Sequence, residues 1–384
     1  MSSIALAIHE QSSSIALAIH EQSSSIALAI HEQSSSIALA IHEQSSYNVV
    51  MFSKKIAIDL GTANSLVYVS GKGIVLREPT VVAVSVDDEK VVSVGIEARE
   101  MLGKTPENIV ATRPLKNGVI ADYITTEALI RYFINKVTGS SRLTKPDVII
   151  SIPGGATSVE ARAVLEAAYS AGARNAYLIP EPLAAAIGAG LPVSEPSGNM
   201  IVNIGGGTTE IAIISLYGMV VHGSVRVGGN TLDEVITLYI RRKYNLIIGE
   251  NTAERVKIDV GAALPMSKEK HIEVKGRDSI SGFPKTITIS STEIAACISQ
   301  PLSQIGMSIK GVLERTPPEL SSDIVDKGIV LSGGTALLHN LDKHITQYTG
   351  VPVHIADDPL LCVVKGLGKA IENFDIFSRS MIKR

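Results

Sequence analysis

Two short segments, far apart along the chain, have the same unusual pattern. Residues 56–65 read Ile-Ala-Ile-Asp-Leu-Gly-Thr-Ala-Asn-Ser, and residues 201–210 read Ile-Val-Asn-Ile-Gly-Gly-Gly-Thr-Thr-Glu. An apolar run, a polar residue, a glycine turn with hydroxyls and a second apolar run are typical of a tight β-hairpin. Glycine lets the backbone approach a ligand closely and aim successive N–H groups at phosphate oxygens. Two such hairpins, one in each half, predict a phosphate held between two related halves.

The two hairpins differ at one position. The polar residue before the turn is Asp59 in the first hairpin and Asn203 in the second. At this position only the first hairpin therefore carries a negative charge.

The composition excludes several classes of protein. The chain has 384 residues with 35 basic and 38 acidic side chains, so its net charge of −3 gives no electrostatic basis for binding nucleic acid. Cys297 and Cys362 lie far apart among apolar neighbours, which predicts two buried thiols in a reducing compartment rather than a disulfide or zinc site. We find neither a secretory signal nor a run of about 20 apolar residues that would span a bilayer. We expect a cytoplasmic protein.

Residues 1–50 contain a tandem repeat. The unit Ser-Ser-Ile-Ala-Leu-Ala-Ile-His-Glu-Gln recurs four times at a period of 11 residues. Such near-identity in a short unit favours a disordered or non-native extension, with Met51 as the expected natural start. The alternative is a helical stripe that binds a metal through its histidines or lies on a membrane. Each unit has only Glu as a charged residue, whereas membrane-surface helices usually carry Lys or Arg.

From residue 51 onward, strand-like and helix-like segments alternate, which predicts an α/β fold. Residues 157–160 and 251–254 have the pattern of capping boxes that begin helices. A linker composition over residues 191–198 places a boundary between the halves near residue 195. We expect strands over residues 80–86, 91–94, 147–152, 177–179, 271–274 and 286–289, and helices over 126–137, 157–171, 183–189, 231–242 and 293–313, the last with a kink or break at Pro301.

A third glycine turn follows another predicted strand. Residues 328–335 read Gly-Ile-Val-Leu-Ser-Gly-Gly-Thr, and a helix is expected over residues 336–341. A turn without side chains can pack against an adenine or ribose, where a side chain would collide.

The three glycine segments, in this order, resemble those of the superfamily of actin, heat-shock chaperone ATPases and sugar kinases. Several further stretches are similar to the MreB family of bacterial actins, and the resemblance covers residues 51–384. It implies an α/β, actin-like (ribonuclease H-like) two-lobed fold, each lobe a mixed sheet flanked by helices, with smaller inserted subdomains. These stretches are residues 61–64, 113–122, 181–192, 225–229, 249–255 and 316–324.

The resemblance also implies a division of the chain. Lobe I covers residues 51–195 with a small subdomain inserted at roughly 83–114. Lobe II covers residues 196–350 with a small subdomain inserted at roughly 231–291. Residues 351–384 return to lobe I, and residues 1–50 are the repeat tail.

A nucleotide, ATP or GTP, with Mg²⁺ in the cleft between the lobes is the ligand that the resemblance implies. A Walker P-loop is excluded because the pattern Gly-x-x-x-x-Gly-Lys-[Ser/Thr] does not occur. Asp59 would hold Mg²⁺ through water, with a weakened contribution from Asn203, since Mg²⁺ prefers few carboxylates and many waters. The nucleotide-binding residues implied are Gly61, Thr62, Ala63, Asn64, Gly205, Gly206, Gly207, Thr208, Glu254, Lys257, Gly333, Gly334 and Thr335.

Glu181 matches the family residue that, together with Thr208, orients the attacking water. Phosphoryl transfer depends mainly on such positioning and on charge stabilisation. The sequence alone also fits a purely structural role for Glu181, because a carboxylate at a helix start interacts favourably with the helix dipole. In the same way, Asp59 fits a role in satisfying turn amides, and Glu254 is the last residue of a predicted capping box.

The chain departs from the family pattern at two positions. Asn203 stands where the family normally has Asp, which predicts weaker Mg²⁺ retention and slower hydrolysis with nucleotide binding kept. Thr335 stands where a third glycine is usual. A β-branched residue is poor at positive φ, so we expect an altered turn or a slightly narrower pocket.

The functional expectation is an ATP-dependent protein that polymerises into filaments at the inner face of the cytoplasmic membrane. Its partners would be itself, the cell-wall elongation machinery and a membrane adaptor. Met101 and Leu102, flanked by Arg99 and Lys104, form the candidate membrane loop, and packing of both side chains into the small subdomain is the alternative. Two other functions stay open: a nucleotide-gated scaffold without useful hydrolysis, and a kinase of small metabolites, for which no additional motif is found.

Overall fold

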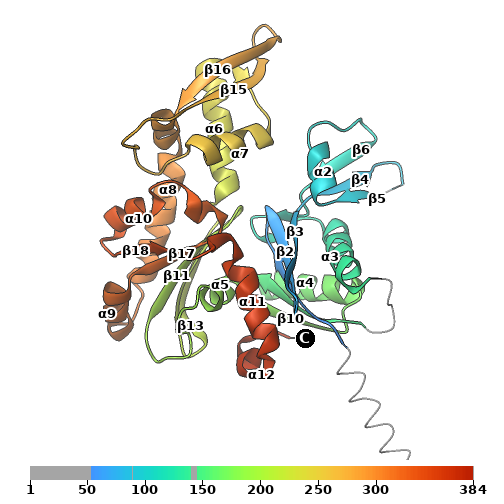
Figure 1. Ribbon diagram of the computed structural model, residues 1–384, viewed down its shortest axis with the longest axis vertical. Coiled ribbons are helices and arrows are strands. Elements are labelled where there is room, and N and C mark those ends of the chain that lie inside the picture. Colours follow the sequence, from blue (N-terminus) through green and yellow to red (C-terminus); the bar gives the residue numbers. More distant parts are fainter. Residues whose placement is uncertain (1–52, 89, 140–144, 384) are drawn as a thin grey trace, which may run out of the picture. The chain divides into compact units, whose positions relative to one another are not determined.

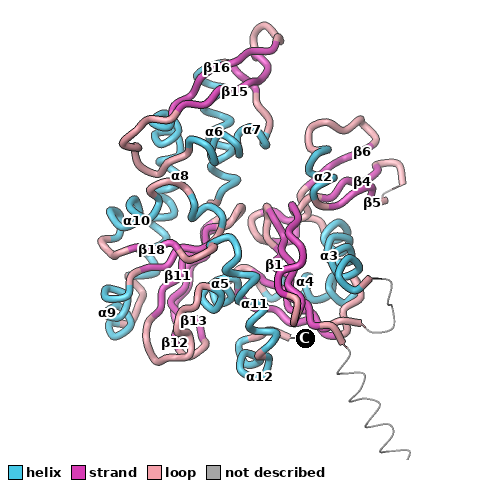
Figure 2. The backbone as a smooth tube through the Cα atoms, viewed as in Figure 1, coloured by secondary structure: helices cyan, strands magenta, loops and turns pink. Residues whose placement is uncertain are grey.

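The computed structural model describes residues 53–88, 90–139 and 145–383. The predicted repeat tail therefore lies outside the described residues. Within residues 54–384, helices and strands alternate as expected for an α/β chain, and two five-stranded sheets form its framework (Figures 1 and 2).

The first large sheet has the strand order β10-β9-β1-β2-β3. β1 pairs antiparallel with β2 and parallel with β9, so the first predicted hairpin is confirmed. Ile56 and Ile58 of β1 pack in one buried cluster with Leu129 and Phe133 of α3 and Leu165 of α4. These elements are β1 Lys55–Leu60, β2 Asn64–Val69, β3 Gly73–Pro79, β9 Asp147–Ile152, β10 Asn175–Pro180, α3 Tyr123–Thr138 and α4 Ser158–Ser170.

The second large sheet has the order β13-β12-β11-β17-β18 and repeats the arrangement of the first. β11 pairs antiparallel with β12 and parallel with β17, so the second predicted hairpin is also confirmed. Met200 and Val202 of β11 are buried with Ile305 and Ile309 of the long helix α8. These elements are β11 Asn199–Ile204, β12 Thr209–Ser215, β13 Gly218–Val225, β17 Ile329–Ser332, β18 Val353–Ile355, α8 Ser291–Leu313, α9 Pro318–Lys327 and α10 Leu341–Thr349.

Two helices, α5 (Glu181–Gly188) and α11 (Cys362–Glu372), lie between the large sheets (Figure 1). They share a buried cluster with Ala57 of the first sheet and Ala212 of the second. Their backbones touch: a methyl group on Gly188 would lie 1.7 Å from the carbonyl oxygen of Cys362. Glycine is therefore required where these helices cross.

Smaller elements extend from each large sheet. On the first side they are β4 Val82–Ser85, β5 Val91–Val94, α2 Ile96–Met101, β6 Ile109–Thr112, β7 Leu115–Lys116 and β8 Val119–Ile120. On the second side they are α6 Gly229–Tyr244, β14 Leu246–Ile247, α7 Glu250–Val260, β15 His271–Asp278 and β16 Pro284–Ser290. The remaining elements are η1 Gly334–Leu337, η2 Pro359–Leu361, α12 Phe374–Phe377 and η3 Ser378–Ser380.

Three local predictions have different outcomes. The capping box at Thr157 is confirmed, because Glu160 N donates to Thr157 Oγ1 (3.2 Å) and Thr157 N donates to Glu160 Oε2 (2.7 Å). The one at Asn251 is wrong: α7 begins at Glu250 after Gly249, without a side-chain cap. The helix predicted over 336–341 is also wrong, because a 3₁₀ turn precedes α10 there.

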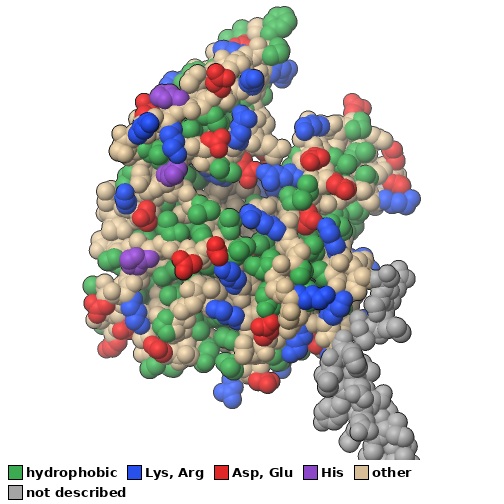
Figure 3. All heavy atoms as spheres, viewed as in Figure 1, with side chains coloured by type: hydrophobic (Ala, Val, Ile, Leu, Met, Phe, Trp, Pro, Cys, Tyr) green, Lys and Arg blue, Asp and Glu red, His purple; other side chains and the backbone are tan. Residues whose placement is uncertain are grey.

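The candidate membrane loop is partly buried. Met101 and Leu102 pack against the small buried cluster of Val81, Ala83 and Ala98, which is the packing alternative. Within the described part of the chain, no helix is both long and apolar enough to cross a membrane. Large apolar side chains are exposed instead in the connection between β15 and β16, at Ile280 and Phe283. Hydrophobic side chains gather at the top of the view in Figure 3, where Figure 1 places this hairpin.

Candidate functional site

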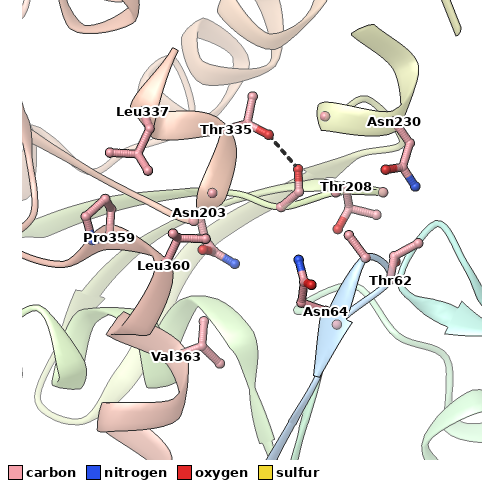
Figure 4. A pocket seen from close by; sticks show the side chains of 18 of the residues that line it. Thr62, Asn64, Asn203, Thr208, Asn230, Thr335, Leu337, Pro359, Leu360 and Val363 are labelled. Atoms are coloured by element: carbon pink, nitrogen blue, oxygen red, sulfur yellow. Dashed lines mark hydrogen bonds between the residues drawn. The ribbon is translucent and has the colours of Figure 1, made fainter. Parts of the chain in front are cut away.

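The two glycine turns face each other across one cleft. A methyl group on Gly206 would lie 2.7 Å from Cβ of Ala63, and one on Gly207 would lie 2.7 Å from Oγ1 of Thr62. Thr62 and Asn64 of the first turn and Thr208 of the second point into the same space (Figure 4). Any larger residue at position 206 or 207 would push the two turns apart.

Helix α6 begins directly behind the second turn. Gly229 N donates to Gly205 O (3.0 Å), and Asn230 N donates to Gly206 O (2.8 Å). In a trans peptide the C=O and N–H groups point in opposite directions. The N–H groups of Gly206 and Gly207 therefore point away from α6, as a phosphate cradle requires.

Asp59 is the residue before the end of β1 and lies beside the cleft. Its carboxylate accepts a hydrogen bond from Ser151 Oγ of β9 (3.0 Å), and the same hydroxyl accepts from Leu60 N (3.1 Å). Burial raises the pKa of Asp59 to about 7, and the Ser151 hydrogen bond opposes this rise. A nearby cation would lower this pKa again and favour the ionised carboxylate. The buried position of Asp59 is therefore suited to binding a cation.

Asn203 holds Glu181 in place. Its amide Nδ2 donates to Glu181 Oε2 (3.4 Å), and its Oδ1 accepts from Ser332 Oγ (3.1 Å). Burial, followed by the nearby charges of Asp59 and Glu210, raises the pKa of Glu181 well above its ordinary value. An amide at position 203 therefore suits this site, because a carboxylate there would add another negative charge.

Glu181 lies both at a helix start and in the cleft, and its role in orienting water stays a prediction. It is the first residue of α5, so its carboxylate lies at the positive end of the helix dipole. It also lines the cleft.

The third glycine turn is not strained at Thr335. The positive φ of this turn belongs to Gly333 (86°), where a methyl group would lie 2.3 Å from Ile204 O. Thr335 lies in the 3₁₀ turn η1, and its hydroxyl donates to Gly205 O at 2.9 Å (dashed in Figure 4). The expected strain of a β-branched residue at positive φ is therefore absent, because the left-handed position is still a glycine. The slightly narrower pocket stays a prediction.

Helix α7 forms the far wall of the cleft and is anchored on both sides. Lys257 Nζ donates to Gly229 O (2.9 Å) and pairs with Asp233 Oδ2 of α6 (2.7 Å). The carboxylate of Glu254 pairs with Arg99 of α2, on the other side of the cleft. Arg99 is thus engaged within the protein and does not flank a membrane loop as a free cation.

All of the nucleotide-binding, metal-binding and water-orienting residues predicted from the sequence line this one cleft, which has a volume of about 350 Å³. Their convergence on one cleft leaves their individual roles as proposals. They are Asp59, Gly61, Thr62, Ala63, Asn64, Glu181, Asn203, Gly205, Gly206, Gly207, Thr208, Glu254, Lys257, Gly333, Gly334 and Thr335.

The apolar wall of the cleft was not predicted from the sequence. Ile258 is 64% exposed and Leu337 is 54% exposed, which is unusual for large apolar side chains and suggests a surface for a flat apolar group. Asn230 was also missed, although it directly follows a stretch already recognised. Pro359, Leu360 and Val363 carry no motif that could have identified them. The wall consists of Ile258, Leu337, Leu338, Pro359, Leu360 and Val363.

Comparisons with known proteins agree with this geometry. The family model described as "MreB/Mbl protein" matches residues 53–379. The cell shape-determining protein MreB of Escherichia coli (strain K12) is 52% identical over 331 residues, covering 85% of this chain and 95% of the relative. The cell shape-determining protein Mbl of Bacillus subtilis (strain 168) is 49% identical over 325 residues, covering 85% and 98%.

The chain belongs to the MreB/Mbl family.

Solved structures support the same family fold. The crystal structure of MreB5 of Spiroplasma citri bound to ADP has a TM-score of 0.81 and 38% identity, and it covers 85% of this chain and 98% of that one. A double helical filament of MamK has a TM-score of 0.70 at 21% identity, covering 83% and 99%, and shows the fold alone. The fold is therefore the actin-like, two-lobed α/β fold, with the cleft described above between its lobes.

The residues of this family member fit a nucleotide with a divalent cation. The cradle of Gly206 and Gly207 is closed to any side chain, and Asp59 offers one buried carboxylate. Among the described residues, no group of three His, Cys, Asp or Glu side chains could hold a metal ion alone. The Asp59 carboxylate beside this cradle fits Mg²⁺, which keeps most of its waters and is often shared with phosphate oxygens.

Proposed function

We propose that this protein binds ATP in the cleft between its lobes and assembles into filaments of a cytoskeleton that sets cell shape. The observation that carries the proposal is the close approach of the two glycine turns, Gly206 to Ala63 and Gly207 to Thr62, beside the third turn at Gly333. Structures of MreB5 bound to ADP and to AMPPNP, and the names of relatives as cell shape-determining proteins, support it.

The cleft residues divide into three roles in this proposal. The turns at 61–64 and 205–208 bind the phosphates through backbone N–H groups. Asp59 contacts Mg²⁺ through water, with a weaker contribution from Asn203, and the bound ion would neutralise phosphate charge. Glu254, Lys257 and residues 333–335 bind the ribose and base, with Ile258 and Leu337 against the flat face of the base.

Slow hydrolysis of ATP is the proposed reaction. Glu181 and Thr208 orient the attacking water, and filament turnover follows phosphate release. Asn203 slows this step, because it leaves Asp59 as the single carboxylate beside the metal. The second candidate, a nucleotide-gated scaffold with no useful hydrolysis, is favoured by the same residue.

The proposed setting is the inner face of the cytoplasmic membrane, where filaments organise cell-wall synthesis. The partners would be other copies of this chain, the cell-wall elongation machinery and its membrane adaptor. Met101 and Leu102 are half-buried and are weak anchors by themselves. Liposome pelleting of a Met101→Ser/Leu102→Ser variant against the parent tests this loop, and unchanged pelleting removes it.

Sedimentation with simultaneous phosphate release, with and without ATP and Mg²⁺, tests the proposed function. ATP-dependent pelleting with phosphate release supports the filament-forming ATPase, and pelleting alone supports the scaffold. Phosphate release that requires an added hydroxyl compound would instead indicate a kinase. A protein that neither pellets nor binds nucleotide would contradict the proposal.

A further inference from the structure

A carboxylate with no assigned role lies beneath the cleft. Glu210 is 1% exposed and stands on β12, two residues after Thr208. It does not line the cleft, and its register partner on β11 is Asn203. A buried carboxylate is costly unless its oxygens are hydrogen-bonded, so its partners indicate what it does.

Glu210 binds the turn that follows β9, from the other lobe. Gly154 N donates to Glu210 Oε2 (3.1 Å), and Ser224 Oγ of β13 donates to Glu210 Oε1 (2.6 Å). The same strand β9 carries Ser151, which donates to Asp59. The end of β9 is therefore bound by a carboxylate from each lobe.

The turn at residues 153–155 also contacts the elements that carry both proposed catalytic side chains. A methyl group on Gly154 would lie 3.1 Å from Cγ of Pro182, the residue next to Glu181. A methyl group on Gly118 would meet both Cγ of Pro153 (2.8 Å) and Cγ2 of Thr208 (3.4 Å), so Pro153 and Thr208 flank the same small space. Movement of this turn would therefore shift Glu181 relative to Thr208.

We propose that Glu210 is a positioning residue for water attack: by fastening the 153–155 turn to lobe II, it sets the spacing between Glu181 and Thr208. It touches neither nucleotide nor metal. This inference rests on the proposed ATPase, and it adds a residue that acts through the other two. A 1 Å misplacement of catalytic groups can reduce a rate about 100-fold, so a fastening bond at this position is significant.

The hydrogen bonds themselves predict which substitutions are tolerated. In Glu210→Gln the amide oxygen can accept from Gly154 N while the NH₂ group donates to Ser224 Oγ, because a hydroxyl both donates and accepts. Glu210→Ala removes both bonds. We expect single-turnover phosphate release to fall roughly 10- to 100-fold in Glu210→Ala, with ATP affinity within about twofold of the parent's, and to return largely in Glu210→Gln.

A matched control separates positioning from general loss of stability. Glu78 is another buried carboxylate that accepts from a backbone amide, Ile96 N (3.1 Å), and it pairs with Lys136 (2.8 Å) away from the cleft. Glu78→Ala should lower the melting temperature without slowing phosphate release. If Glu210→Ala does not fold, Gly154→Ala serves instead, because its methyl group would lie 3.1 Å from Cγ of Pro182 and 3.4 Å from Oε2 of Glu210. This crowding should shift the turn slightly and slow release several-fold.

Capture of aluminium fluoride by the ADP-bound protein provides a readout that does not depend on turnover. The parent and Glu210→Gln should capture this phosphoryl mimic, and Glu210→Ala should capture it at least about tenfold more weakly with ADP affinity unchanged. Equal loss in Glu78→Ala and Glu210→Ala, unchanged capture in Glu210→Ala, or no capture by the parent would overturn the inference. Absence of ATP binding by the parent would instead overturn the proposed function.

Discussion

The two hairpins of this protein have the same backbone arrangement and different side-chain chemistry. Each places its first strand between an antiparallel partner and a parallel one, and each ends in a glycine turn at the cleft. Asp59 of the first hairpin accepts one hydrogen bond, from Ser151 Oγ, and its carboxylate can still interact with a cation. Asn203 of the second binds Ser332 and Glu181. The repeated fold thus brings two glycine turns to one cleft, while single side chains give the two turns different charge and hydrogen bonds.

The largest effect is expected where the hairpins touch. Gly207→Val would place a branched side chain against Thr62 and hold the turns apart, at an expected loss of about 3 kcal/mol of ATP binding, or roughly 100-fold in affinity. Calorimetric titration with ATP measures this directly. Gly311→Val is the control, because an added Cβ at that half-buried helical position would have no neighbouring atom within 4 Å. Normal affinity in Gly207→Val would break the idea that both turns bind one ligand.

Asp59→Asn should have the next largest effect and would make the two hairpins chemically alike. Removing a group that contacts Mg²⁺ through water typically reduces metal affinity about 10- to 100-fold. We expect a corresponding fall in Mg²⁺-dependent ATP affinity, measured by fluorescent-nucleotide competition. With EDTA present, the parent and the variant should bind ATP alike. A difference that persists in EDTA would assign Asp59 a structural role.

Asn203→Asp gives the second hairpin the same carboxylate as the first and so tests the difference between the hairpins from the other side. It restores a second carboxylate, so turnover should rise by up to about tenfold with Mg²⁺ present. Without Mg²⁺, the new charge faces Glu181 and removes its amide donor, so the melting temperature should fall by a few degrees. The matched measurements are phosphate release and thermal unfolding, each with Mg²⁺ and with EDTA. Unchanged turnover would contradict the role given to Asn203.

The smallest effect is expected for the ion pair between Arg113 and Glu250, which joins the two sides of the cleft. Arg113 pairs with Glu250 of α7 at 3.5 Å, and neither residue lines the cleft. Exposed ion pairs contribute at most about 1 kcal/mol, so Arg113→Glu should speed nucleotide dissociation only about two- to fivefold. The double charge reversal Arg113→Glu/Glu250→Arg should restore the parent rate. Failure of that rescue would mean that Arg113 acts through another contact.

Much of the site was predictable because each glycine turn has a short, contiguous sequence pattern. Local residues, chiefly glycines, determine the geometry of the turns at 61–64, 205–208 and 333–335. The alternation of apolar and polar residues locates the strands of the hairpins. The resemblance to the family linked these turns to Glu181, Glu254 and Lys257, and all of them line the cleft in the structure.

The rest depends on tertiary packing that no local pattern records. Pro359, Leu360 and Val363 reach the cleft only because α11 packs between the two sheets. The pairing of Arg99 with Glu254 joins segments that are distant in sequence. The N-cap of α7 was misplaced by two residues, because Asn251 fits a capping pattern that the structure does not use.

A crystal structure with Mg²⁺ and AMPPNP tests the central claim most directly. The account predicts a triphosphate between residues 61–64 and 205–208, with Mg²⁺ waters hydrogen-bonded to Asp59 and the Asn203 amide still bound to Glu181. A nucleotide that contacts only one turn, or a metal centred on Asn203 with Asp59 uninvolved, would contradict it.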